Sequence, residues 1–190
     1  MVWLFMLLNK NKFSYPVIFL ALLVSFSIIS CDKGIAPLPE TNTDLVGFDG
    51  KVTFYGSWPA GIQQTYIVVF KQALQSSSDF FPPNLSYVVG PIPYGATEYS
   101  YNSIDNNGVS SFTLSPGNYN YVVVAQSTKS TLSLNRSDWT VVGIYYLPGD
   151  TTNPGTLLIK SGEITHNINI TCNFDNPPPQ PPQIAINKNE

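Results

Sequence analysis

The sequence predicts an all-β fold, a single antiparallel β-sandwich of seven to nine strands, preceded by a cleaved signal peptide. Short runs of alternating apolar and polar residues recur through residues 46–174, and such alternation is typical of strands with one buried face. Clusters of Gly, Pro, Asn and Asp separate these runs and indicate turns. No segment after residue 30 has a helical period, so a series of strands and turns favours a sandwich.

The expected strands follow one another along the chain. Residues 66–70, and the second half of residues 119–125, are apolar on both faces, which indicates central strands. Residues 75–83 are expected as a loop and residues 85–89 as a short edge strand. The full series of expected strands is 51–58, 66–70, 85–89, 97–102, 112–114, 119–125, 139–147, 156–160 and 163–174.

The last strand, residues 163–174, has the most regular alternation. Its even positions hold Ile, His, Cys and Phe, and its odd positions hold Glu, Thr and Asn. We therefore expect the even positions to face inward. This places Cys172 in the core as an inert, small hydrophobic residue, and it places His166 at the edge of the core with a backbone partner.

The N-terminus has the pattern of a secretory signal. Lys10 and Lys12 precede residues 13–30, an apolar stretch without charge. Eight mostly apolar residues come before these two charges, whereas a signal normally opens with its charges. The translation start is therefore left open between Met1 and Met6.

The apolar stretch ends in four residues, Ile28, Ile29, Ser30 and Cys31. This tetrapeptide resembles the bacterial lipobox. The resemblance implies that diacylglycerol alkylates the Cys31 thiol, that signal peptidase cuts just before Cys31, and that the new amino terminus is acylated. Such a chain is anchored stably in a membrane of the cell envelope, in a leaflet that the sequence leaves open. The alternative is an uncleaved helix, since about 18 apolar residues barely span a bilayer.

Two Pro-containing segments flank the expected domain. Residues 31–45 are rich in turn formers and are expected to be a flexible tether. Residues 175–190 begin with a polyproline stretch and are expected to be a disordered tail that acts as a spacer or chain end. The expected organisation is therefore a signal peptide (1–30), a tether (31–45), a β-sandwich domain (46–174) and a tail (175–190).

The composition argues against nucleic acid as a partner. Charged residues make up only 11% of the chain, and there are 9 basic and 12 acidic residues. Loss of residues 1–30 removes two lysines, which leaves 7 basic against 12 acidic residues and a net charge of −5. The remaining basic residues are scattered and form no patch in the sequence, so we expect no binding to nucleic acid.

Three segments resemble the carboxypeptidase regulatory-like domains. Asp49–Thr53 resembles their opening strand, Leu114–Val124 their Pro-Gly-x-Tyr strand, and Lys160–Thr165 their closing Gly-Glu-x-Thr hairpin. The resemblance implies a transthyretin-like (prealbumin-like) sandwich of the kind found in exported bacterial proteins, mostly without enzymatic activity. An insertion around residues 74–108 departs from the family pattern. A rival resemblance, to fibronectin type III domains, rests on Trp58 and on the corner at residues 114–119.

Residues capable of catalysis or metal binding are scarce. With one histidine, His166, and one cysteine left after lipidation, Cys172, a His-rich zinc site cannot be built. On one extended strand these two residues are about 20 Å apart, too far for a nucleophile and its base. Asp105–Gly108 lacks the ligand spacing of a calcium loop and is expected to be a plain turn. We therefore expect a protein that is not an enzyme and has no metal or cofactor.

Aromatic residues are the remaining candidates for ligand binding. Surface aromatics can stack on sugar rings, but they also fill the cores of sandwiches. The candidates are Trp58, Trp139, Tyr145 and Tyr146. The main hypothesis is a non-enzymatic, lipid-anchored envelope protein that acts as an interaction or structural module for an unknown envelope protein or glycan. The alternative is a carbohydrate-binding or adhesion module that uses these aromatic residues.

Overall fold

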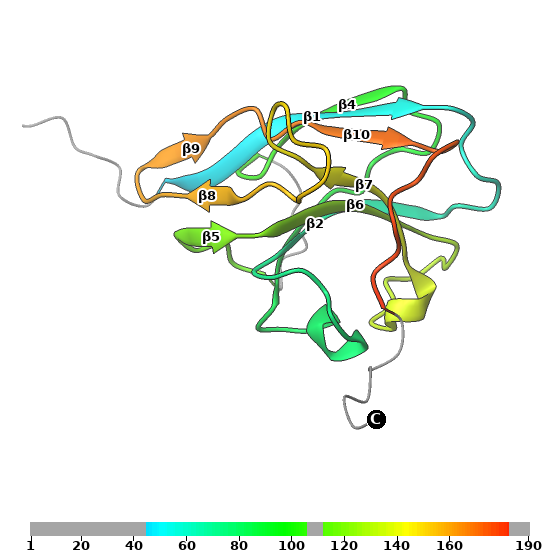
Figure 1. The fold of residues 1–190 in the computed structure, drawn as a ribbon, viewed down its shortest axis with the longest axis horizontal. Coiled ribbons are helices and arrows are strands. Elements are labelled where there is room, and N and C mark those ends of the chain that lie inside the picture. The colour runs from blue at the N-terminus through cyan, green and yellow to red at the C-terminus, as the bar shows by residue number, and fades with distance from the viewer. Residues whose placement is uncertain (1–44, 106–111, 183–190) are drawn as a thin grey trace, which may run out of the picture. The chain divides into compact units, whose positions relative to one another are not determined.

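The computed structural model describes residues 45–105 and 112–182, and this part of the chain is all-β as predicted (Figure 1). Ten strands and two short 3-10 helices form its regular structure. The elements in chain order are β1 (Val46–Tyr55), β2 (Gln64–Phe70), η1 (Ser77–Phe80), β3 (Leu85–Val89), β4 (Glu98–Asn102), β5 (Gly117–Tyr119), β6 (Tyr121–Ser127), η2 (Arg136–Asp138), β7 (Thr140–Tyr145), β8 (Leu157–Ile159), β9 (Glu163–Thr165) and β10 (Ile170–Asn173).

Eight of these strands form one mixed sheet. Its order is β3-β2-β6-β7-β10-β1-β4, and β9 also pairs with β1, while β5 and β8 form a separate pair. β1 runs parallel to both β9 and β10, and the other pairs are antiparallel. The expectation of a wholly antiparallel fold is therefore wrong. Its basis was the short turns between neighbouring strands, whereas β1 pairs with strands that lie more than 100 residues further along the chain.

The expected strand 163–174 is interrupted in the structure. Its first part, β9, pairs with residues 46–48 of β1, and its second part, β10, pairs with residues 52–55. Four residues, 166–169, therefore stand opposite three residues of β1, as in a β-bulge. Asn167 adopts a φ of 65° within this interruption.

The interruption changes which side chains face inward. Cys172 is buried as expected. The His166 side chain, in contrast, is 64% exposed, so the expectation that it faces inward at the edge of the core is wrong. The alternation that predicted it assumes an unbroken strand, and the extra residue shifts the phase between β9 and β10.

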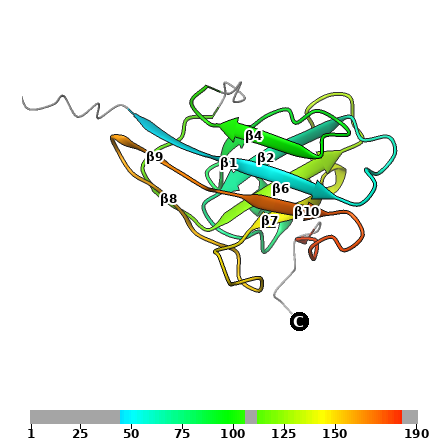
Figure 2. The ribbon, with the colours of Figure 1, turned by 90° about the horizontal axis from the view of Figure 1, so that it is seen from above.

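The sheet curls so that its two halves face each other. Strands β4, β1 and β10 lie over β7, β6 and β2 in Figure 1, and the view from above in Figure 2 agrees. The chain of pairs passes from one half to the other between β7 and β10. At the other end, the Tyr87 hydroxyl of β3 donates a hydrogen bond of 2.9 Å to the carbonyl of Ser103, just after β4. The two ends of the strand order are thus joined by a side chain.

Side chains from both halves of the sheet fill the space between them. We call this cluster the inner core. Its rings pack edge to face, with Phe48 against Tyr87 and Tyr101. Its buried members are Phe48, Val52, Phe54, Ile67, Val69, Val89, Ile92, Tyr101, Tyr119, Val122, Val124, Val142, Tyr145, Leu157, Ile159, Ile168, Ile170 and Cys172.

A second cluster, the outer core, covers the opposite face of β2, β3, β6 and β7. Successive residues of β2 and β6 alternate between the two clusters, so these strands are buried on both faces, as predicted for central strands. Its cover comes from loops, residues 71–84 and 128–139, not from a further layer of strands. Its buried members are Val68, Phe70, Leu74, Phe80, Leu85, Val88, Tyr121, Val123, Ala125, Trp139, Val141 and Ile144.

The Pro-rich segment after β10 is held against the domain through residue 182. The Gln180 side chain accepts a hydrogen bond from the Val141 N–H and donates one to the Val141 carbonyl, both at 2.8 Å. Pro181 is buried, and its carbonyl accepts a hydrogen bond from Arg136. The expected tail, residues 175–190, therefore contacts the domain through side chains at Gln180 and Pro181, and residues 183–190 lie outside the described residues.

The N-terminal predictions fall on residues that the structure does not describe. The signal peptide, the Ile28–Cys31 motif and almost all of the tether precede residue 45. Within residues 45–105 and 112–182, no helix has the length and hydropathy needed to cross a membrane.

Candidate functional site

An apolar pocket opens on the loop-covered face of the sheet. The space that it encloses is small, about 50 Å³, or about 590 Å³ when the open solvent at its mouth is included. The floor is the outer face of four strands, and the walls are the two loops of the outer core together with Phe112. The lining residues are Tyr66, Val68, Phe70, Leu74, Phe80, Leu85, Val88, Phe112, Val123, Ala125, Leu132, Ser133, Leu134, Arg136, Trp139 and Val141.

The first wall, residues 71–84, is braced by two polar side chains. The Asp79 carboxylate accepts hydrogen bonds of 2.8 Å from the N–H groups of Gln75 and Ser76. These backbone hydrogen bonds hold the pKa of the Asp79 carboxyl below its usual value. Asn84 closes the base of the loop by donating to the carbonyls of Gln72 and Asp79. The bracing directs the buried Phe80 into the outer core.

The second wall, residues 128–139, is braced around Ser133. Its hydroxyl donates a hydrogen bond of 2.5 Å to the Asp138 carboxylate, and its carbonyl accepts one of 2.8 Å from the Trp139 indole N–H. Asn135 caps the short helix η2 by accepting from the Ser137 N–H. This wall therefore holds the Trp139 ring in the outer core, with only 6% of the residue exposed.

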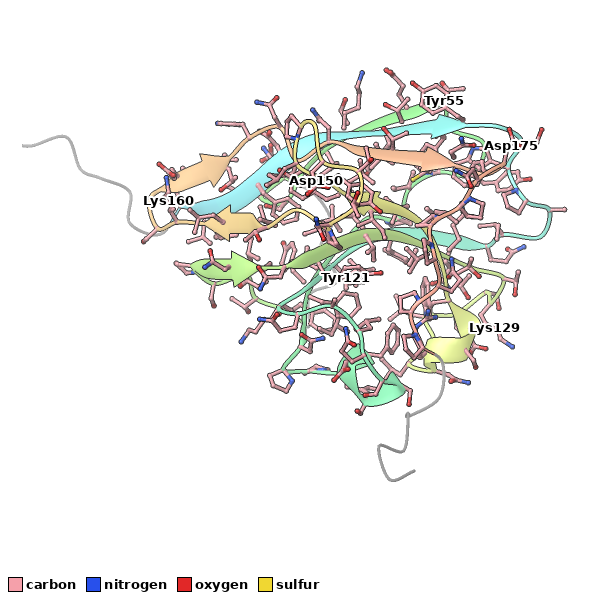
Figure 3. The ribbon with its side chains drawn as sticks, viewed as in Figure 1. Tyr55, Tyr121, Lys129, Asp150, Lys160 and Asp175 are labelled. Carbon is pink, nitrogen blue, oxygen red and sulfur yellow. The ribbon has the colours of Figure 1, made fainter. Side chains whose placement is uncertain are left out.

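Arg136 is the charged residue of the pocket lining, and only 3% of it is exposed. Its two terminal nitrogens donate to the carbonyls of Trp139, at 2.5 Å, and Pro181, at 3.0 Å. Its Nε atom is buried and has no hydrogen-bond partner among the described residues. Burial lowers the pKa of Arg136 and raises the pKa of its neighbour Tyr121 to about 12. Figure 3 labels Tyr121 on the side of β6 that the loops cover.

The rim of the pocket carries exposed leucines. Leu134 is 60% exposed and Leu132 is partly exposed, and both also line the pocket. Large apolar side chains left in water beside an apolar recess are a frequent mark of a binding surface. The recess and its rim together have the chemistry of a site for an apolar group.

A second, polar depression lies over the interruption between β9 and β10. The Asp49 carboxylate is 2.7 Å from Nδ1 of His166 and also accepts from the Asn167 N–H. Gly50 is required here because a Cβ at that position would lie 2.2 Å from the Ile168 carbonyl oxygen. The depression is lined by Asp49, Gly50, Lys51, Tyr99, Ser100, Tyr101, Asn102, Asp105, Asn167 and Asn169. It is wide and open, and its lining combines hydrogen-bonding groups with apolar surface in about equal parts.

The four aromatic residues singled out in the sequence do not form one exposed surface. Trp58 is half-buried against the inner core, and its indole N–H donates to the Ala96 carbonyl at 2.9 Å. Trp139 is buried in the outer core, on the other face of the sheet. Tyr145 is buried in the inner core, and Tyr146 packs partly buried against the outer core. A strand pattern cannot tell an outward face in water from one covered by a loop.

His166 and Cys172 lie in different environments. His166 is at the surface beside Asp49, and the Cys172 thiol is buried, which raises its pKa. Among residues 45–105 and 112–182, no three His, Cys, Asp or Glu side chains are grouped closely enough to hold a metal ion. The turn expected at Asp105–Gly108 lies mostly outside the described residues.

The pocket was not predicted, although the sequence contains a signal for it. The loop residues Leu74, Phe80, Leu132 and Leu134 are large and apolar in segments otherwise rich in Ser and Asn. Apolar residues in loops indicate contact with a second surface. Burial of Arg136 has no comparable local signal, because charged residues in loops are usually exposed.

The sequence and the fold were compared with known proteins. No protein-family model matches the chain, and no curated protein and no solved structure matches it.

Proposed function

We propose that this chain is a non-enzymatic, lipid-anchored protein of the bacterial cell envelope whose β domain is an interaction module for an apolar group. The lipobox-like residues Ile28–Cys31 support the anchor. The apolar pocket is the observation that carries the interaction role. Its loops are braced by side chains and its rim presents leucines, as in preformed ligand sites.

The proposal extends to the fold. We propose that the two facing halves of the curled sheet are a sandwich of the transthyretin-like kind, with the fibronectin type III arrangement as the rival. The stacking of β4, β1 and β10 over β7, β6 and β2 supports a sandwich. The parallel pairing of β1 is the feature that either family would have to accommodate.

The positions of the reactive side chains support a role without catalysis. Cys172 is enclosed in the inner core, where its thiol stays protonated, and His166 lies beside Asp49 at the surface. A nucleophile and its general base must be within hydrogen-bonding distance, which this separation prevents.

The intact mass of the membrane-bound protein tests the anchor. The expected product starts at Cys31 and carries added acyl mass, and the Cys31→Ala variant lacks that mass. An unmodified precursor in the membrane fraction would contradict the anchor and favour a membrane-spanning segment at residues 13–30.

A photoreactive dodecanol tests the pocket. Added to membranes that contain the full chain, the alcohol is expected to label peptides from residues 71–85 and 132–139. The Ala125→Leu variant, which adds bulk to the pocket floor, should reduce labelling at least about tenfold. Ala60→Leu is the matched control, because Ala60 is exposed and outside the pocket. Equal labelling of all three chains would contradict the proposed role.

A carbohydrate-binding or adhesion role is the second candidate, and the polar depression favours it. Carboxylate, amide and hydroxyl groups converge there, and these groups hydrogen-bond sugars. Coprecipitation with insoluble envelope polysaccharides tests this role. Binding that is lost in a chain carrying both Asp105→Ala and Asn169→Ala would support it, and binding unchanged by both substitutions would exclude the depression as the site.

A further inference from the structure

Exposed apolar side chains gather on the face of the sheet that the two loops cover. In the second loop, Leu134 is 60% exposed and Leu132 is 43% exposed. In the first loop, Phe81 is 41% exposed and packs against the pocket residue Phe80. The short helices of these loops, η1 and η2, lie on the same side of the sheet, as the green and yellow coils in Figure 1 show. Large apolar side chains in water beside an apolar recess indicate contact with a second surface.

The recess between the loops is too small to receive an alkyl chain. It encloses about 50 Å³, and its accessible lining is almost wholly apolar. A partner must therefore cover the mouth and surround the exposed side chains of the rim. This geometry favours a broad apolar partner into which the protein inserts Leu132, Leu134 and Phe81.

The two loops carry little charge that would have to leave water in such a contact. Of their five charged residues, Arg136 is buried, and Lys129 lies 3.8 Å from Asp138 in an ion pair. The Asp79 carboxylate already accepts hydrogen bonds from two backbone N–H groups. Lys71 is exposed at the start of the first loop, and a lysine can extend its ammonium group to lipid headgroups. Charged groups are costly in apolar surroundings, so this arrangement suits a face that leaves water.

The length of chain before the domain brings one apolar partner within reach. The segment from Cys31 to Leu45 spans about 50 Å at most when fully extended. A folded domain of this size has a radius of gyration of about 14 Å, so lipid attachment at Cys31 would let any face of the domain reach the bilayer. The same attachment would prevent the domain from diffusing away. Contact with the bilayer would then be an intramolecular event, for which a few apolar side chains suffice.

We infer that the loop-covered face docks on the bilayer that holds the lipid of Cys31. Leu132, Leu134 and Phe81 insert between the headgroups and reach the first acyl carbons, a depth typical of proteins that lie in the membrane interface. The inference rests on the proposed function, because it names the partner of the same apolar face. The polar depression, on the half of the sheet that contains β1 and β4, then faces away from the membrane.

Fluorescence quenching at chosen positions tests this orientation. The lipidated full chain is reconstituted in phosphatidylcholine vesicles, with a fluorophore attached at Leu134→Cys or, as the control, at Tyr55→Cys. Tyr55 is 56% exposed and lies on the side of the molecule away from the loops (Figure 3). The lipid blocks Cys31, and Cys172 is buried with a raised pKa, so the introduced thiol is the one that reacts. Phospholipid with a nitroxide near the headgroup end of its acyl chain should quench the Leu134→Cys label at least about threefold more than the control label.

A second substitution shows whether both loops hold the face on the bilayer. Phe81→Ser, added to the labelled Leu134→Cys chain, should reduce the quenching at least about twofold, because the first loop loses its inserted side chain. Leu158→Ser is the matched control, since Leu158 is 44% exposed on β8, outside both loops, and should leave the quenching unchanged. Protection of Cys172 from alkylation shows that each variant is folded.

The outcomes separate the inference from the proposed function. Equal quenching of the two labels, or quenching of neither, would overturn the docking inference, and the proposed role would stand if photoreactive dodecanol still labels the loops. Absence of both quenching and loop labelling would contradict the proposed role itself. Quenching that Phe81→Ser leaves unchanged would overturn the inference, because the first loop would then not touch the bilayer. Crosslinking of two chains through Leu134→Cys in place of quenching would also overturn it and identify a second copy as the partner.

Discussion

The inner and outer cores share strands but are closed in different ways. The inner core is enclosed by two facing halves of one sheet, and its members come largely from the strands themselves. The outer core has a strand floor of similar composition, but two loops and short 3-10 helices cover it. Strands in register leave few gaps, whereas loops stabilised by individual hydrogen bonds cover a surface incompletely. The pocket, with the exposed Leu132 and Leu134 at its rim, is found where the cover is made of loops.

The largest expected effect lies in the inner core. Phe48 is fully buried and contacts the rings of Tyr87 and Tyr101. Phe48→Ala should lower the free energy of unfolding by about 4 kcal/mol, because the surrounding strands cannot close the cavity. Urea denaturation followed by circular dichroism measures this loss.

Alkylation of Cys172 gives an independent readout of the same core. The thiol is buried and its pKa is raised, so iodoacetamide should modify it only when the inner core opens. Peptide mapping distinguishes Cys172 from Cys31. Rapid alkylation of Cys172 in the native chain would mean that the inner core opens readily, contrary to its enclosure by facing strands.

A smaller effect is expected in the outer core. Phe80 lies in the first loop and packs against Phe70 and Phe81. Phe80→Ala should cost about 2 kcal/mol, since a loop can move inward and fill part of the cavity that rigid strands would leave. Phe81→Ala is the matched control, because this neighbour is exposed and should change stability by less than about 0.5 kcal/mol. A loss as large as that of Phe48→Ala would remove the distinction between the two cores.

Acid should loosen the first loop before it affects the sheet. The Asp79 carboxyl has a lowered pKa in the folded chain, so its ionised form favours the closed loop. This stabilisation is present above the ordinary aspartate pKa of 3.8 and is lost as the pH falls through the lower, folded-state value. Hydrogen exchange of residues 71–84, corrected for intrinsic rates, should increase between pH 5 and pH 2.5, while β6 keeps its protection.

The control for the acid prediction is Asp79→Asn. An amide at this position does not titrate, so exchange in the loop should be faster than in the native chain at pH 5 and should change little with acid. A loop that loosens equally with acid in this variant would show that Asp79 is not the responsible group.

The smallest expected effect on stability is at the rim. Leu134→Ser replaces an exposed side chain and should change the free energy of unfolding by less than about 0.5 kcal/mol. The same substitution should reduce labelling by photoreactive dodecanol about threefold, because part of the apolar mouth is removed. Leu158→Ser, at another exposed leucine, should alter neither quantity. Equal labelling of both variants would show that Leu134 at the rim does not contribute to binding in the pocket.

Patterns within one strand predicted much of the fold. The apolar runs at residues 66–70 and in the second half of residues 119–125 are indeed in central strands, and residues 85–89 form a strand at one end of the sheet order. These predictions depend on side chains a few residues apart, which a local pattern contains. The parallel pairing of β1 with β9 and β10 depends on residues more than 100 positions apart.

The candidate site was less predictable than the fold. An alternating pattern shows that a face is apolar, but not whether strands, loops or water cover it, so the pattern alone leaves Trp139 a candidate for the surface. The alternation that predicts an inward-facing His166 similarly contains no sign of the bulge at Asn167. Arg136 is buried because the carbonyls of Trp139 and Pro181 accept its hydrogen bonds. The hydrogen bond to Pro181 joins residues that are 45 positions apart in the chain.

The pairing of Gln180 with Val141 has a consequence for self-association. β10 ends its pairing with β7 at Gly143, which leaves the start of β7 with backbone groups facing outward. Such open N–H and C=O groups are templates on which another chain can add a strand and begin to aggregate. The Gln180 amide occupies both groups of Val141 with a donor and an acceptor, as a neighbouring strand would. One side chain thus blocks intermolecular strand addition at this position.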